Sequence, residues 1–182
     1  MLTAFLISLL CVYQSPDADA KCFGWKENNH DSLTVYVFLL DECLISQYFT
    51  PELTRLHVTY KKEGVGFIGL FPNSISSAER IRDFATDYHI SFPMEGDYDY
   101  KWTKKFKITV TPEVAVWDHD TERLIYRGRI DDSYVRVGKR KLHPQHHDLE
   151  AIIESWIDGS VPEQLTETQA IGCFINFDTP RE

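Results

Sequence analysis

The chain has no surplus of positive charge, no internal repeat and no low-complexity tract. Its net charge of -9 argues against a nucleic-acid partner, because phosphate binding needs clustered Lys and Arg side chains. The one basic run, residues 136–141, is either a solvated loop or a docking site for an acidic partner. A hydrophobic share of 43% and an aromatic share of 13% argue against disorder, and 182 residues fit one domain with a sizeable core.

The apolar run at the start of the chain, residues 2–12, is too short to span a bilayer. Ala18-Asp19-Ala20 follows it and has the small-x-small pattern of a signal-peptidase cleavage site. We therefore predict a signal peptide over residues 1–20, and an exported protein, periplasmic or extracellular, without a stable membrane span after cleavage. The main domain is expected over residues 21–159, followed by a tail over residues 160–182.

Cysteine is scarce, with four in the whole chain. Cleavage after Ala20 would remove Cys11 and leave Cys22, Cys43 and Cys173. Three cysteines in an exported protein allow one disulfide and leave one thiol over. The sequence leaves the pairing open between Cys43–Cys173 and Cys22–Cys173.

Strand and helix patterns alternate along the chain. Continuous apolar runs predict buried strands, and two later runs predict a hairpin; these are residues 33–40, 65–71, 113–117 and 124–128. Helical spacing follows Thr50-Pro51-Glu52, which predicts a cap and first turn, and a capping box at residues 76–79 opens another helix. Further helices are expected over 100–106 and over 148–159, where Asp148 is the predicted cap, with a polar insertion at 131–147 between them. This order predicts an α/β fold with a mixed central sheet flanked by helices on both faces.

Cys43 stands between the first predicted strand and a segment that reads as a helix. The N–H groups of a helix start favour a thiolate, whereas the neighbouring carboxylates of Asp41 and Glu42 oppose its ionisation. Much later, Thr111-Pro112 comes directly before another strand. A cysteine at a strand-to-helix turn and a Thr-Pro loop occur in this order in the thioredoxin-like fold, which the chain resembles.

Within that superfamily, the chain resembles the redoxin branch, the alkyl hydroperoxide reductase and thiol-specific antioxidant group, and an exported bacterial subgroup of it. The segments that carry the resemblance are residues 41–46, 111–113, 126–132, 147–149 and 172–174. The resemblance implies that Cys43 is the reactive sulfur, facing solvent. It also implies a cis Thr111-Pro112 peptide across from Cys43, whose backbone pairs with an incoming extended chain.

The chain departs from the patterns of this fold at three positions. Ser46 stands where disulfide oxidoreductases carry the second cysteine of Cys-x-x-Cys, so Ser46 cannot resolve an oxidised Cys43. Tyr36 and Leu40 stand where peroxiredoxins place a Pro and a Thr or Ser before their reactive cysteine. Cys173 is the candidate resolving sulfur, because a sulfenate or a mixed disulfide on Cys43 needs a second thiol to release it.

Other polar residues leave alternatives open. Arg127 and Arg129 either orient a peroxide or an acidic substrate, or are exposed and pair with Asp131 or Asp132. The cluster His143, His146 and His147 is either a solvated loop or a transition-metal site with Cys43, although no cofactor or metal is predicted.

Three functions follow from these patterns. The first is an exported thiol–disulfide redox protein in which Cys43 acts on a protein thiol or disulfide and Cys173 resolves it. The second is a thiol peroxidase with a small thiol or hydroperoxide as substrate and the same cysteines. The third is a redox-inactive or copper-binding module on a thioredoxin-like scaffold.

Overall fold

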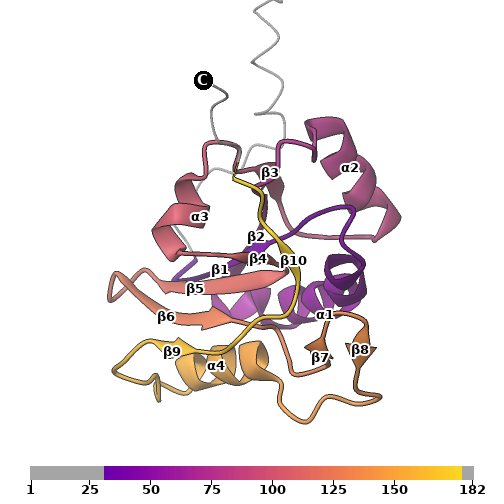
Figure 1. Cartoon of the computed structure of the whole chain (residues 1–182). Coiled ribbons are helices and arrows are strands. Elements are labelled where there is room, and N and C mark those ends of the chain that lie inside the picture. The colour runs from indigo at the N-terminus through magenta and orange to yellow at the C-terminus, as the bar shows by residue number, and fades with distance from the viewer. Residues whose placement is uncertain (1–30, 178–182) are drawn as a thin grey trace, which may run out of the picture.

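A six-stranded mixed sheet forms the centre of the protein (Figure 1). The computed structural model describes residues 31–177. The strands lie in the order β3-β2-β1-β5-β6-β9. Their bounds are β1 Leu33–Phe38, β2 Val65–Phe71, β3 Met94–Gly96, β5 Glu113–Asp118, β6 Arg123–Gly128 and β9 Thr166–Glu167. β1 is parallel to β2, and β2 to β3, whereas β5 is antiparallel to both β1 and β6.

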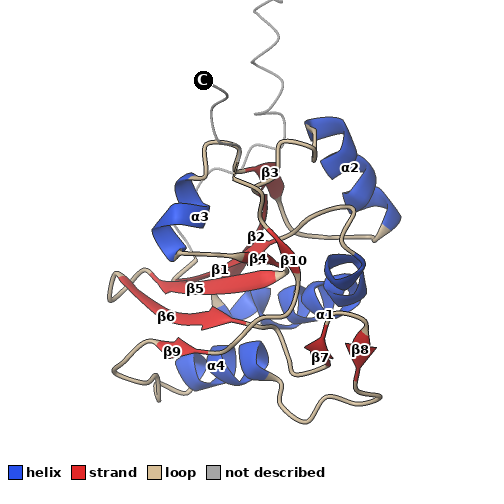
Figure 2. Cartoon of the chain, viewed as in Figure 1, coloured by secondary structure: helices blue, strands red, loops and turns tan. Residues whose placement is uncertain are grey.

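Helices cover both faces of this sheet (Figures 1 and 2). Their bounds are α1 Leu44–Tyr60, α2 Ala78–Asp87, α3 Lys101–Phe106 and α4 Asp148–Ile157, with a 3-10 turn, η2 Lys61–Glu63, after α1. Buried side chains of α1, α2 and α4 pack in one hydrophobic cluster, and those of α3 pack in a second. The predicted α/β fold with a mixed sheet between helices is confirmed. Within the described residues, no helix has the length and apolar character needed to cross a membrane.

β1 contributes side chains to both hydrophobic clusters. Val35 and Val37 belong to the cluster with α1, and Tyr36 and Phe38 to the cluster with α3, because successive side chains of a strand point to opposite faces. All six residues of the strand are buried. This double burial explains the unbroken apolar run in the sequence, and it fixes where the chain leaves the sheet toward Cys43.

Helix α1 begins six residues earlier than the predicted cap at Thr50, so Pro51 lies inside the helix. The prediction was wrong because proline was read as a first-turn residue. Pro51 has no N–H to donate to the carbonyl of Gln47, one helical turn earlier. The hydroxyl of Thr50 donates to that carbonyl instead, over 2.8 Å. The Thr50-Pro51 pair therefore continues the helix that begins beside Cys43.

The start of α2 also differs by one residue from the predicted capping box. Ser77 is the N-cap, and its hydroxyl oxygen accepts a hydrogen bond from the N–H of Arg80 over 3.3 Å. The hydroxyl of Ser76 is engaged elsewhere, because it donates to the Asp41 carboxylate over 2.5 Å. This contact ties the loop before α2 to the loop before Cys43.

The polar insertion and the tail add three small pieces of sheet. The insertion folds into a hairpin of β7 Tyr134–Arg136 and β8 Lys139–Arg140, which carries most of the basic run. The tail supplies β9, parallel to β6 at the edge of the main sheet, and β10 Cys173–Phe174, which pairs with β4 Val110–Thr111. Figure 1 shows the tail crossing the sheet toward β4. The predicted signal peptide and Cys22 lie outside the described residues.

Candidate functional site

Cys43 is the N-cap residue of α1, at the end of a short turn that follows β1. Its N–H donates to the carbonyl of Leu40 over 3.0 Å, and its own carbonyl accepts from the N–H of Gln47 over 3.0 Å. Ser46 is fully buried, and its hydroxyl oxygen accepts from the N–H of Leu40 over 3.2 Å. Ser46 therefore holds the turn that presents Cys43.

A disulfide joins Cys43 to Cys173, with the two Cα atoms 6.3 Å apart and a sequence separation of 130. Of the two pairings that the sequence leaves open, the structure forms Cys43–Cys173. The tail brings a second sulfur to the start of α1. Ser46, at the place of the second cysteine in a Cys-x-x-Cys motif, has no thiol to supply it.

The Thr111-Pro112 peptide bond is cis, and the loop faces Cys43. The carbonyl oxygen of Thr111 lies 3.3 Å from Sγ of Cys43. The expectation that this sulfur faces solvent is wrong, because Cys43 is 1% exposed. The strand that carries Cys173 lies against the same loop, so the tail covers the Cys43 sulfur, while Cys173 itself is half-buried.

Strand β10 is held on the Thr-Pro loop by backbone pairing. Cys173 is opposite Thr111, and Phe174 is opposite Val110, in an antiparallel register. The hydroxyl of Thr111 also donates to the carbonyl of Cys173 over 3.4 Å. The tail thus uses the pairing mode that the sequence resemblance assigns to an incoming extended chain.

Arg80 on α2 neutralises the acidic pair beside Cys43. Its guanidinium lies 2.5 Å from the carboxylate of Asp41 and 2.7 Å from that of Glu42. The negative charges of Asp41 and Glu42 oppose a thiolate at Cys43, and the ion pairs with Arg80 offset those charges. Arg80 was missed because it is 37 residues beyond Cys43, and only the packing of α2 brings it back.

Neither arginine singled out in the sequence pairs with Asp131 or Asp132. Arg127 forms an ion pair with Glu167 on β9 and donates to the carbonyl of Phe106 over 3.0 Å. Arg129 binds the carboxylate of Asp148 over 2.8 Å. His147 rather than Asp148 is the N-cap of α4, and the Asp148 side chain is engaged with Arg129 instead. Both arginines therefore fasten the tail and α4 to the sheet.

A cavity of about 580 Å³ lies beside the tail, lined in part by Glu113, Arg127, Gly172 and Phe174. Glu113 is 6% exposed, and its carboxylate accepts from the N–H of Thr109 over 3.1 Å. Burial raises the pKa of Glu113 above its ordinary value of 4.5. Glu113 alternates along β5 with Val114, which packs in the same cluster as Cys43, so this carboxyl belongs to the opposite face of the sheet.

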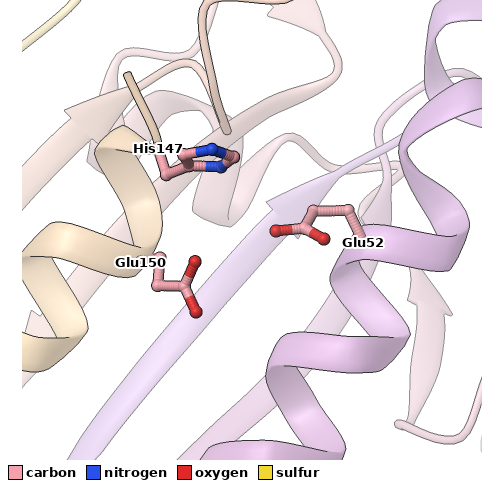
Figure 3. Close-up of side chains that lie close together, drawn as sticks. All are labelled: Glu52, His147 and Glu150. Carbon is pink, nitrogen blue, oxygen red and sulfur yellow. The ribbon is translucent and has the colours of Figure 1, made fainter. Parts of the chain in front are cut away.

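The three histidines of the polar insertion do not gather at Cys43. In the part of the chain that the structure describes, one group of possible metal ligands converges, formed by Glu52, His147 and Glu150 (Figure 3). Arg55 already binds both carboxylates, over 2.7 Å to Glu52 and 2.9 Å to Glu150. Glu52 and Glu150 therefore belong to an ion-pair network, centred on Arg55, that joins α1 to α4.

No protein-family model and no curated protein matches the chain. Solved structures do. An uncharacterized conserved protein from Geobacillus kaustophilus is similar over 84% of this chain and 80% of that one, with 26% identity and a TM-score of 0.71. A hypothetical protein from Sinorhizobium meliloti 1021 is similar over 84% and 82%, with 22% identity and a TM-score of 0.70.

The thioredoxin domain of a thiol-disulfide oxidoreductase from Bacteroides vulgatus is similar over 70% of this chain and 81% of that one, with 13% identity and a TM-score of 0.53. At this identity the likeness concerns the fold. In this chain the fold consists of a mixed six-stranded sheet with helices on both faces. The chain therefore has a thioredoxin-like fold.

Proposed function

We propose that this protein is an exported thiol–disulfide redox protein whose working pair is Cys43 and Cys173. The observation that carries the proposal is the disulfide itself, which joins the N-cap of α1 to a tail seated on the cis Thr111-Pro112 loop. A disulfide with the structural role of holding the tail alone would not require a cysteine at the N-cap of a helix. There, the helix dipole favours a thiolate by about 0.3–1 kcal/mol, and up to about 2 kcal/mol when partly buried.

Each site residue has a distinct part in this proposal. Cys43 attacks a partner disulfide as a thiolate, and Cys173 displaces the partner from Cys43. Thr111 and Pro112 position the partner chain across from the sulfur. Ser46 is a positioning residue, because its hydroxyl fixes the turn at Leu40.

The partner in this proposal is a protein disulfide, and the place of action is outside the cytoplasm. Support for export comes from the predicted signal peptide, residues 1–20, and from the disulfide, since disulfides persist in oxidising compartments. The resemblance to the redoxin branch supports thiol chemistry at the same position.

The test is reduction of insulin disulfides and of glutathione disulfide by the reduced protein. Cys43→Ser is expected to abolish turnover. Cys173→Ser is expected to stop after one exchange, with the partner left on Cys43. Cys22→Ser, the control, is expected to retain turnover. Unchanged rates for Cys43→Ser would overturn the proposal.

A further inference from the structure

The tail lies as an extended segment along the cis-proline loop, and we call the surface that it contacts there the channel. Besides the two residue pairs between β10 and β4, the N–H of Ile175 donates to the carbonyl of Thr109 over 3.3 Å. These contacts use only main-chain groups of the tail, so by themselves they do not depend on the side chains of the bound segment.

The position before the cysteine accepts only glycine. A Cβ atom on Gly172 would lie 2.2 Å from the carbonyl oxygen of Thr111 and 3.1 Å from the nitrogen of Pro112. Both atoms belong to the backbone of the cis-proline loop, which cannot turn aside as a flexible side chain can.

The two positions after the cysteine differ in what they contact. Phe174 is 79% exposed, whereas Ile175 is 6% exposed and packs in the hydrophobic cluster of α3. The channel therefore buries an aliphatic side chain two places after the cysteine. The side chain directly after the cysteine faces solvent, so its identity is not restricted.

The third residue after the cysteine, Asn176, is held through hydrogen bonds to its main chain. The side-chain oxygen of Asn73 accepts from the N–H of Asn176 over 3.2 Å, and the hydroxyl of Tyr100 donates to the carbonyl of the same residue over 3.2 Å. The ring of Phe177 then lies 5.1 Å from that of Tyr100. Asn73 is itself 6% exposed, so a buried polar side chain is aimed at the peptide backbone.

We propose that this channel is the substrate site of the reduced protein, and that it selects an extended segment with glycine before its cysteine and an aliphatic residue two places after it. The inference rests on the proposed function. The tail, residues 172–177, occupies the site only in the oxidised protein and gives way to the partner when Cys43 and Cys173 are thiols.

The exchange balances in two steps. The Cys43 thiolate attacks the partner's cysteine sulfur, the Cys43–partner S–S bond forms, and the partner's own disulfide breaks, so that its second sulfur leaves as a thiolate and takes a proton from water. The Cys173 thiolate then attacks Sγ of Cys43, re-forms the Cys43–Cys173 disulfide and releases the partner's cysteine. The partner gains two electrons, and the protein's two thiols lose them.

The test uses full-length protein with Cys173→Ser and Cys43 loaded with glutathione. The probe is a free peptide with the sequence of residues 171–177. Exchange of glutathione for peptide on Cys43 is measured at equilibrium by mass spectrometry of the Cys43 fragment. Peptides carrying Gly172→Ala, Ile175→Ser or Phe174→Ser are compared, each corrected for its exchange with free glutathione disulfide. The host's own tail competes equally in every arm.

Gly172→Ala and Ile175→Ser are each expected to lower the exchange constant by about tenfold, because one creates a backbone clash and the other removes a buried aliphatic side chain. Phe174→Ser is expected to leave it unchanged. Equal constants for all four peptides would overturn the inference and leave the proposed function standing. Failure of Cys43 to take up glutathione or any peptide would overturn both.

Discussion

Gly172→Ala provides a direct test of how closely the tail sits on the cis-proline loop. The added methyl group would meet the Thr111 carbonyl oxygen at 2.2 Å, so β10 must move away for the variant to keep its disulfide. Overpacking against rigid atoms costs about 3 kcal/mol, at the upper end for one inserted methyl group. Alanine also lowers the conformational entropy of the tail in the reduced protein, and this offsets about 0.5–1 kcal/mol of that cost. The net cost of forming the disulfide is therefore about 2 kcal/mol.

This cost lowers the equilibrium constant for oxidation of the Cys43–Cys173 pair by about 30-fold. The reduction potential of the pair is expected to rise by roughly 40 mV, because about 30 mV corresponds to 1.4 kcal/mol for a two-electron couple. The assay is equilibration in glutathione buffers, followed by alkylation of free thiols and mass spectrometry. Phe174→Ala is the matched control in the same strand, since that side chain is 79% exposed. An unchanged potential for Gly172→Ala would refute the close approach.

Four further predictions concern the surroundings of Cys43 and the buried carboxyl. Ser46→Ala leaves the N–H of Leu40 without its partner and is expected to lower the free energy of unfolding by about 1–3 kcal/mol in urea titrations; an unchanged midpoint would contradict this. Arg80→Ala leaves Asp41 and Glu42 unpaired and should slow alkylation of reduced Cys43 at neutral pH, whereas a faster rate would count against the ion pairs. Burial raises the pKa of Glu113, so the folded protein holds that proton more tightly and loses stability as pH rises above 4.5; Glu113→Gln should reduce this loss in unfolding curves taken at pH 4.5 and at neutral pH. Stopped-flow oxidation of the reduced protein by hydrogen peroxide should be no faster than that of free cysteine, because Leu40 offers no hydroxyl to the peroxide, and a faster rate would favour the peroxidase hypothesis.

The elements that the sequence predicted well are those decided by local burial. β1 and β2 are unbroken apolar runs because both of their faces are covered, and this pattern needs no knowledge of the tertiary structure. The start of α1 could not be placed, because Pro51 is a common first-turn residue. Only the hydroxyl of Thr50, bonded to the carbonyl that proline leaves free, shows why the helix continues through it.

The candidate site was predictable in its parts and less so in its assembly. Cys43 and the Thr111-Pro112 loop stood out by their places beside strands, but the covering of Cys43 depends on the path of the tail. That path is set by contacts distant in sequence, such as Asn176 with Asn73. Asn73 lies two residues after the predicted strand 65–71, and no pattern in the sequence marked it. The sequence shows a glycine directly before the tail cysteine. The need for glycine at position 172 comes from the nearby Thr111 carbonyl, which only the structure reveals.

The disulfide also encloses most of the described fold, because the sequence separation between Cys43 and Cys173 is 130. Closing a loop of that length removes conformational freedom from the unfolded chain, and the chain-entropy relation puts the effect at about 5 kcal/mol. Each cycle of oxidation and reduction would then change the protein's resistance to heat and proteolysis. The molecule would be at its most fragile while it holds two free thiols, ready for the next partner.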